Sequence, residues 1–111
     1  MVIKRTSKQL AKRFAKDFVE YLKKKDKLPV DEAYLFGSYS KGKQKDWSDI
    51  DVAIVSPSFK GKRDPYEYLW SRLRDTDVQR GIEPVGFHPK DFRNAISPLV
   101  IEIQKYGERM A

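Results

Sequence analysis

The segment YLFGSYSKGKQKDWSDIDVAIV, residues 34–55, decides the fold. Two short apolar runs, residues 33–36 and 50–55, contain the β-branched and aromatic residues that predict two buried strands. A polar link that contains glycine joins the two runs. The second run is unusual at its start, because Asp51 lies inside it and Asp49 directly precedes it. Acidic residues are rarely buried, so the position of these two aspartates requires a chemical explanation.

The sequence on either side of this segment predicts three helices. Thr6-Ser7 can cap the first helix, and apolar residues then recur every four positions: Leu10, Phe14, Phe18 and Leu22. An Asp-Pro pair at residues 64–65 is typical of the start of a second helix. A Ser-Pro pair at residues 97–98 indicates the start of a last helix, which we expect to end near Gly107.

Residues 82–87 predict a third strand, and Pro84 favours either a place for it at the edge of the sheet or an irregularity in the strand. The order of elements is then helix, strand, strand, helix, strand, helix. This order predicts an α/β domain with helices packed on a small sheet. No stretch resembles a linker or a second core, so we expect residues 1–111 to form a single domain.

The composition excludes several classes of protein. Because the chain has no cysteine, disulfides and thiolate chemistry are excluded. No apolar run is long enough to span a membrane, and we expect a cytoplasmic protein. The net charge of +7 is compatible with an anionic partner and equally with an ordinary basic surface. Nucleic-acid binding is the least favoured interpretation, because no nucleic-acid motif accompanies the charge.

Asp49 and Asp51 are expected on one face of the second strand, because alternate residues of a strand point the same way. At the usual strand rise their Cα atoms lie about 6.6 Å apart, so both carboxylates can reach one divalent cation. Burial and mutual repulsion raise the pKa values of such a pair, and Mg²⁺ relieves that repulsion. Two solvated acids at a strand end are the alternative interpretation of this pattern alone.

Gly37 and Ser38 directly follow the first predicted strand. Glycine permits a tight turn and the close approach of a phosphate, whose oxygens can bind backbone N–H groups and a hydroxyl. The link continues with Lys41, Gly42 and further lysines, which can hold a polyphosphate. An ordinary turn followed by a hydrated basic loop is the alternative.

The combination is more specific than its parts. Gly37-Ser38, ten intervening residues and Asp49-Ile50-Asp51 on a strand resemble the signature of the polymerase-β nucleotidyltransferase superfamily. The segment GSYSKGKQKDWSDIDVAIV, residues 37–55, is most similar to the minimal nucleotidyltransferase branch, of the MntA-like antitoxin type. Ser48 also matches this branch. The resemblance implies the fold of the polymerase-β catalytic domain, a small mixed β-sheet with helices packed on it.

The resemblance also implies a mechanism with two Mg²⁺ ions held by three carboxylates, in which an acceptor hydroxyl displaces pyrophosphate at the α-phosphate. Asp49 and Asp51 match the first two acids. Glu83, on the next strand, is the candidate for the third, where the family more often has Asp; Asp75 and Asp77 are the alternatives. The residues expected to bind the nucleotide are Gly37, Ser38, Lys41, Gly42 and Ser48.

The function implied by the resemblance is Mg²⁺-dependent transfer of a nucleoside monophosphate, AMP from ATP, to an acceptor hydroxyl. Family members of this size often work with a separately encoded HEPN-type helical protein. Some are antitoxins that adenylylate a tyrosine of that toxin, as in type VII toxin–antitoxin pairs. The alternative is a catalytically weak nucleotide-binding antitoxin that acts by protein–protein binding, because Lys41 and Glu83 depart from the family pattern. Apolar surface left without a second domain would favour a homo-oligomer.

Overall fold

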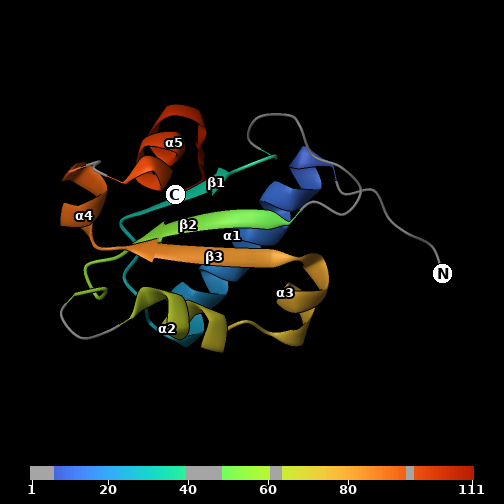
Figure 1. Cartoon of the computed structure of the whole chain (residues 1–111). Coiled ribbons are helices and arrows are strands. Elements are labelled where there is room, and N and C mark those ends of the chain that lie inside the picture. Colours follow the sequence, from blue (N-terminus) through green and yellow to red (C-terminus); the bar gives the residue numbers. More distant parts are fainter. Residues whose placement is uncertain (1–6, 40–48, 61–63, 95–96) are drawn as a thin grey trace.

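The computed structural model describes residues 7–39, 49–60, 64–94 and 97–111. Within these ranges the chain forms a four-stranded sheet, in the order β3-β2-β1-β4, with helices on both faces (Figure 1). The strands are β1 (Glu32–Phe36), β2 (Ile50–Val55), β3 (Ile82–Phe87) and β4 (Glu108–Arg109). The helices are α1 (Lys8–Lys25), α2 (Pro65–Ser71), α3 (Asp75–Arg80), α4 (Pro89–Asn94) and α5 (Pro98–Tyr106).

The sheet is mixed, as the resemblance implies. β1 runs antiparallel to β2 and to the short β4, whereas β2 and β3 are parallel. The predicted strands over residues 50–55 and 82–87 have the same bounds in the structure, and β1 begins one residue before its predicted start. β3 lies at the edge of the sheet, as Pro84 indicates, and the indole N–H of Trp70 donates to the Pro84 carbonyl oxygen at 3.1 Å.

α1 covers one face of the sheet. It begins after Ser7, whose hydroxyl oxygen accepts the backbone N–H of Leu10 at 3.1 Å. The predicted apolar stripe packs against the side chains of β2 that point to this face, and α2 lies on the same side. Buried residues in this layer include Ala11, Ala15, Phe18, Leu22, Ile50, Val52, Ile54 and Leu69.

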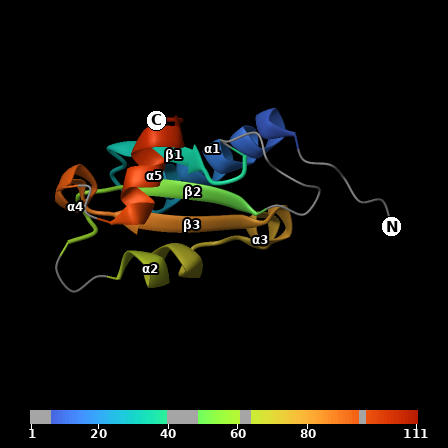
Figure 2. The ribbon, with the colours of Figure 1, turned by 45° about the horizontal axis from the view of Figure 1, so that its top comes forward.

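α4 and α5 cover the other face. Phe92 of α4 and two residues of α5, Val100 and Ile103, form a second apolar cluster with Ala53 and Val55 of β2. Figure 2 shows α5 in front of β1 and β2, with α1 behind them. As a result β2 is buried along its whole length except at one residue, the half-buried Asp51.

Three elements were not predicted: α3, α4 and β4. Each is short, so none has the repeated apolar spacing that indicates a helix or strand. α4 is held by tertiary contacts, since the side-chain amide of Gln104 in α5 donates to the Phe92 carbonyl oxygen at 2.6 Å. None of the helices described is both long and apolar enough to cross a membrane.

Candidate functional site

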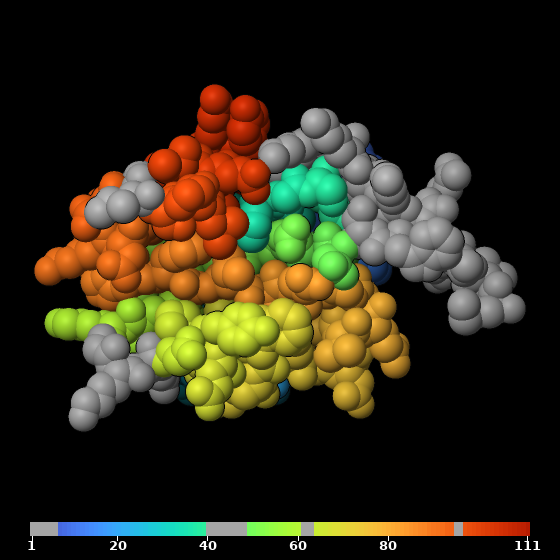
Figure 3. Space-filling model, in the orientation of Figure 1, coloured from blue at the N-terminus to red at the C-terminus, as the bar shows by residue number. Residues whose placement is uncertain are grey.

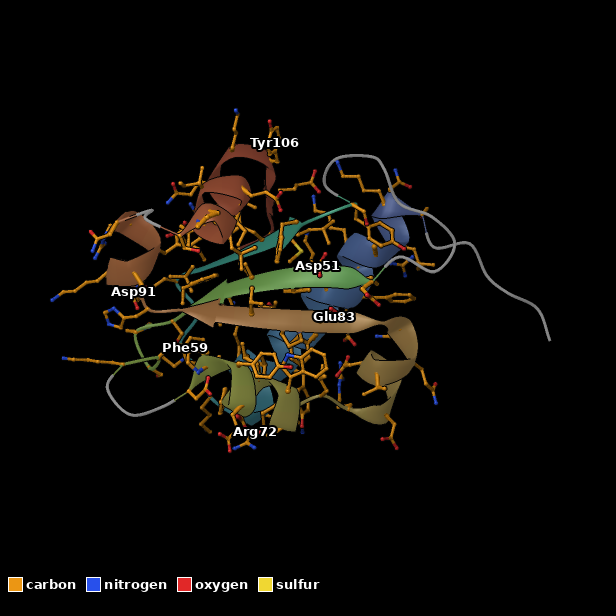
Figure 4. All side chains as sticks on the ribbon, in the orientation of Figure 1. Asp51, Phe59, Arg72, Glu83, Asp91 and Tyr106 are labelled. Carbon is orange, nitrogen blue, oxygen red and sulfur yellow. The ribbon has the colours of Figure 1, made fainter. Side chains whose placement is uncertain are left out.

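Three acidic residues lie at the same end of the sheet. The last residue of β1 lies beside the start of the antiparallel β2, and the start of the parallel β3 lies beside the same end of β2. In the register of the strands, Phe36, Asp51 and Glu83 are neighbours, so the side chains of Asp51 and Glu83 share one face. Figure 4 shows these two residues on adjoining strands. Asp49 directly precedes β2, at the same end.

These carboxylates affect one another's protonation. A hydrogen bond with Asp49, with burial and the charges of Asp49 and Asp51, raises the pKa of Glu83 to about 7. Burial, with the charges of Asp49 and Glu102, raises the pKa of Asp51 to about 6. Asp51 and Glu83 therefore lose their protons at a higher pH than free carboxyl groups do.

The turn after β1 lies directly against Asp51. Gly37 has a φ of +75°, a backbone conformation that side chains strongly disfavour. A Cβ atom at this position would lie 2.1 Å from the Oδ2 atom of Asp51. No other amino acid fits here unless the Asp51 carboxylate moves. The structure thus brings the predicted phosphate-binding turn, which continues with Ser38, against one of the predicted metal-binding acids.

Glu102 of α5 is a fourth acid near this end of the sheet, and the sequence did not indicate it. α5 buries Val100 and Ile103 against the face that carries Asp51. This orientation brings Glu102 close enough for its charge to raise the pKa of Asp51. Helical spacing could have shown that Glu102 lies beside the buried stripe of α5. It could not have shown which strands that stripe covers.

Some predicted residues cannot be placed. Lys41, Gly42 and Ser48, which were expected to bind the nucleotide, lie outside the described residues. Tyr39, which follows the glycine turn, is described and is almost completely buried, so its ring belongs to the core.

The two alternative third acids lie in the first turn of α3, where Asp77 has a structural role. Its buried carboxylate accepts three N–H groups of Arg74, one from the backbone and two from the guanidinium, each at 2.9 Å. The same guanidinium donates to Asp17 of α1 at 2.8 Å, so it joins the two helices. The hydrogen bond with Asp77 is the main reason that the pKa of Arg74 is raised. Of the candidates, Glu83 is the one that the strand register places beside Asp51.

The donor set of the acidic cluster suits a hard divalent cation. Mg²⁺ prefers carboxylate oxygens, and a cation among Asp49, Asp51 and Glu83 would relieve the repulsion that raises two of their pKa values. Within the described ranges, no three acidic or histidine side chains are already arranged to hold a metal ion. The cluster therefore fits a hard cation by the chemistry of its donor atoms.

Known proteins with the same fold include nucleotidyltransferase structures. A candidate nucleotidyltransferase from Sulfolobus solfataricus superposes with a TM-score of 0.66 at 18% identity, over 92% of this chain and 80% of the other. A toxin–antitoxin crystallised with AMP-PNP gives a TM-score of 0.59 at 26% identity, over 86% of this chain and 70% of that one. A mutant of the MntA–HpeT toxin–antitoxin gives 0.56 at 22% identity, with the same coverage of 86% and 70%.

The sequence of the chain also matches a known domain family. No curated protein matches the chain. The nucleotidyltransferase domain family matches residues 15–107, which include the glycine turn, the three acids and the last helix. Because this match covers most of the sequence, the chain belongs to the nucleotidyltransferase domain family.

Proposed function

We propose that the chain is an Mg²⁺-dependent nucleotidyltransferase that moves AMP from ATP to an acceptor hydroxyl. One observation carries the proposal: Asp49, Asp51 and Glu83 meet beside the turn at Gly37, at one end of the sheet. Nucleotidyl transfer needs acids that hold metal ions next to a turn that holds phosphates. The family of the chain makes this the most direct interpretation of the site.

The three carboxylates are the proposed catalytic residues and metal ligands. When bound, Mg²⁺ would neutralise charge on the triphosphate and activate the attacking hydroxyl. Gly37 leaves room for the Asp51 carboxylate, and Ser38 offers its hydroxyl and its N–H to phosphate oxygens. The assignment of Lys41, Gly42 and Ser48 to the nucleotide rests on the sequence motif.

The reaction exchanges a phosphoanhydride bond of ATP for a phosphoester bond to the acceptor. The oxygen of the acceptor hydroxyl forms a bond to the α-phosphorus, while the bond from that phosphorus to the leaving pyrophosphate breaks. The proton of the hydroxyl passes to a carboxylate of the cluster. The residues of the chain thus hold the nucleotide in place and take up charge, and they form no covalent bond with it.

As acceptor we propose a tyrosine of a separately encoded HEPN-type helical protein, in a type VII-like toxin–antitoxin pair. Two of the three solved structures named above are toxin–antitoxins, and one of them contains the ATP analogue AMP-PNP. The described part of the chain also exposes large apolar side chains, which offer contact area to a partner. These are Tyr66, Trp70, Val78, Leu99, Ile101 and Tyr106. A cytoplasmic location accords with the use of ATP.

The alternative is a nucleotide-binding antitoxin that has lost turnover. It is favoured by the fact that, among the described residues, no three side chains are already arranged to hold a metal ion. The two functions can be told apart by the modified partner, because only an active enzyme transfers AMP to it.

The first prediction concerns nucleotide binding. We expect AMP-PNP to bind the wild-type chain in the presence of Mg²⁺. The affinity should fall by about tenfold or more without Mg²⁺, and likewise in the double variant Asp49→Asn/Asp51→Asn, because the metal is no longer held. Isothermal titration calorimetry measures both effects, and circular dichroism checks the fold of the variant. Binding that is unchanged in the double variant would show that these aspartates do not hold the metal.

A pair of variants separates the proposed third ligand from a structural acid. Glu83→Gln should not lower the free energy of unfolding, and should raise it near neutral pH because one acid of the cluster loses its charge, while it weakens Mg²⁺-dependent AMP-PNP binding by about tenfold. Asp77→Asn should leave nucleotide affinity unchanged and lower the free energy of unfolding by about 2 kcal/mol, because the buried partner of Arg74 loses its charge. Urea unfolding and calorimetry measure the two quantities. The reverse pattern would place the third ligand on α3.

Two glycines provide a matched test of the turn. Gly37 and Gly81 have similar φ values, +75° and +79°, so alanine costs similar backbone strain, about 1 kcal/mol, at either. A Cβ at Gly37 would collide with the Asp51 carboxylate, whereas at Gly81 its nearest neighbours would be two atoms of Asp49 at 3.9 Å. We therefore expect Gly37→Ala to abolish Mg²⁺-dependent AMP-PNP binding and Gly81→Ala to retain it. Equal loss in both would assign the effect to backbone strain.

The acceptor is tested with the protein encoded by the neighbouring gene. After incubation with the chain, ATP and Mg²⁺, that protein is expected to gain AMP on a tyrosine, detected by mass spectrometry of the intact protein and its peptides. The variant Asp49→Asn/Asp51→Asn should produce no modification. A stable complex without modification would favour the antitoxin that acts by binding alone, and neither a complex nor modification would reject this acceptor.

A further inference from the structure

A cavity lies at the end of the sheet opposite to the acidic cluster. Its volume is about 410 Å³, and its wall includes the last residues of β3 and the start of α4. Figure 4 shows Phe59 and Asp91, which line it, at the far end of β3 from Asp51 and Glu83. In Figure 3 the surface is recessed at the left, between α4 and the segment that follows β2. The nucleotide site proposed for this chain uses none of these residues.

We propose that this cavity binds a small organic anion, a compound with a planar or apolar body and a phosphate or carboxylate group. The proposal is independent of the proposed nucleotidyl transfer. It rests on the charge, the hydrogen-bond donors, the apolar wall and the size of the cavity.

The charged side chains of the cavity favour an anion. Among the described residues that line it, Lys60 and Lys90 stand against a single carboxylate, Asp91. Within the part of the chain that is described, neither lysine side chain has an ion pair or a hydrogen bond. By contrast, Arg72 and Arg74 each have a carboxylate partner. Two cations without partners at one cavity leave it with a positive charge that an anion would balance.

His88 adds a hydrogen-bond donor to the wall. Its Nδ1 atom accepts the backbone N–H of Lys90 at 3.1 Å. A neutral imidazole that accepts at Nδ1 carries its proton on Nε2, which is then a donor. A donor in the same cavity wall as two lysines is suited to a phosphate or carboxylate oxygen.

The remaining wall and the size indicate that the anion has an organic body. Phe59 and Phe87 contribute apolar surface, and the Phe87 ring is held against Phe92 with 5.8 Å between ring centroids. Pockets for small molecules usually enclose about 300–1,000 Å³ and combine apolar walls with a few polar groups. An inorganic phosphate would fill only part of 410 Å³, so the cavity is matched to a larger molecule.

The single histidine of the chain gives a specific probe, because the imidazole signals in a proton NMR spectrum belong to His88 alone. Phenyl phosphate and benzoate, titrated at constant pH, are expected to shift these signals to saturation. Benzylamine, which has the same ring and the opposite charge, should not. The relative affinities of the two anions identify the preferred group, phosphate or carboxylate. No shift with either anion, or an equal shift with benzylamine, would overturn the proposal.

Three double variants test whether the preferred anion binds in this cavity. Lys60→Gln/Lys90→Gln should weaken the affinity of the preferred anion by about tenfold, as expected when charge-assisted contacts at a solvent-accessible site are lost. Lys16→Gln/Lys25→Gln, with the same change of charge on exposed positions of α1, should leave it unchanged. Asp49→Asn/Asp51→Asn should also bind normally. An anion that binds equally to the Lys60/Lys90 variant, or that fails to bind the Asp49/Asp51 variant, does not occupy this cavity.

Discussion

β2 is buried on both faces, and this double burial decides where the acids of the site can lie. Its side chains alternate between the layer of α1 and the layer of α5, and all of them are apolar except Asp51. A carboxylate in the middle of this strand would be desolvated without a partner, at a cost of several kcal/mol. At the start of the strand, Asp51 meets Asp49, Glu83 and the open turn at Gly37. Packing of the rest of β2 therefore positions the site.

Burial and mutual repulsion of these acids lower the stability of the fold when the acids are ionised. The pKa values of Asp51 and Glu83 are raised to about 6 and about 7, so the folded chain binds more protons than the unfolded chain between pH 4 and pH 7. Stability contributed by these protons is therefore present at low pH and is lost as the pH rises through the folded pKa values. Near neutral pH the acidic cluster opposes folding unless positive charge compensates it. A bound cation removes the same repulsion, so metal binding and stability are coupled at this site.

The sequence predicted the parts of the structure that follow from local pattern. The bounds of β2 and β3, the cap at Ser7 and the edge position of β3 depend on apolar runs, a hydroxyl and a proline, all visible in the chain itself. α3 could not be predicted, because it is held by the contacts of Arg74 with Asp77 and with Asp17, far away in sequence. The position of Glu102 was hidden for the same reason, since it depends on how α5 packs across the sheet.

A site made of carboxylates is a poor place for a polyphosphate unless positive charge is supplied to it. Four acids, including Glu102, face this end of the sheet, whereas the chain as a whole carries a charge of +7. Long-range attraction can therefore bring an anion to the protein, but it cannot hold triphosphate against the acids themselves. In the proposed function, that task falls to a cation between the acids and the phosphates. The chemistry of the proposed transfer would then be set by the ion that these acids hold.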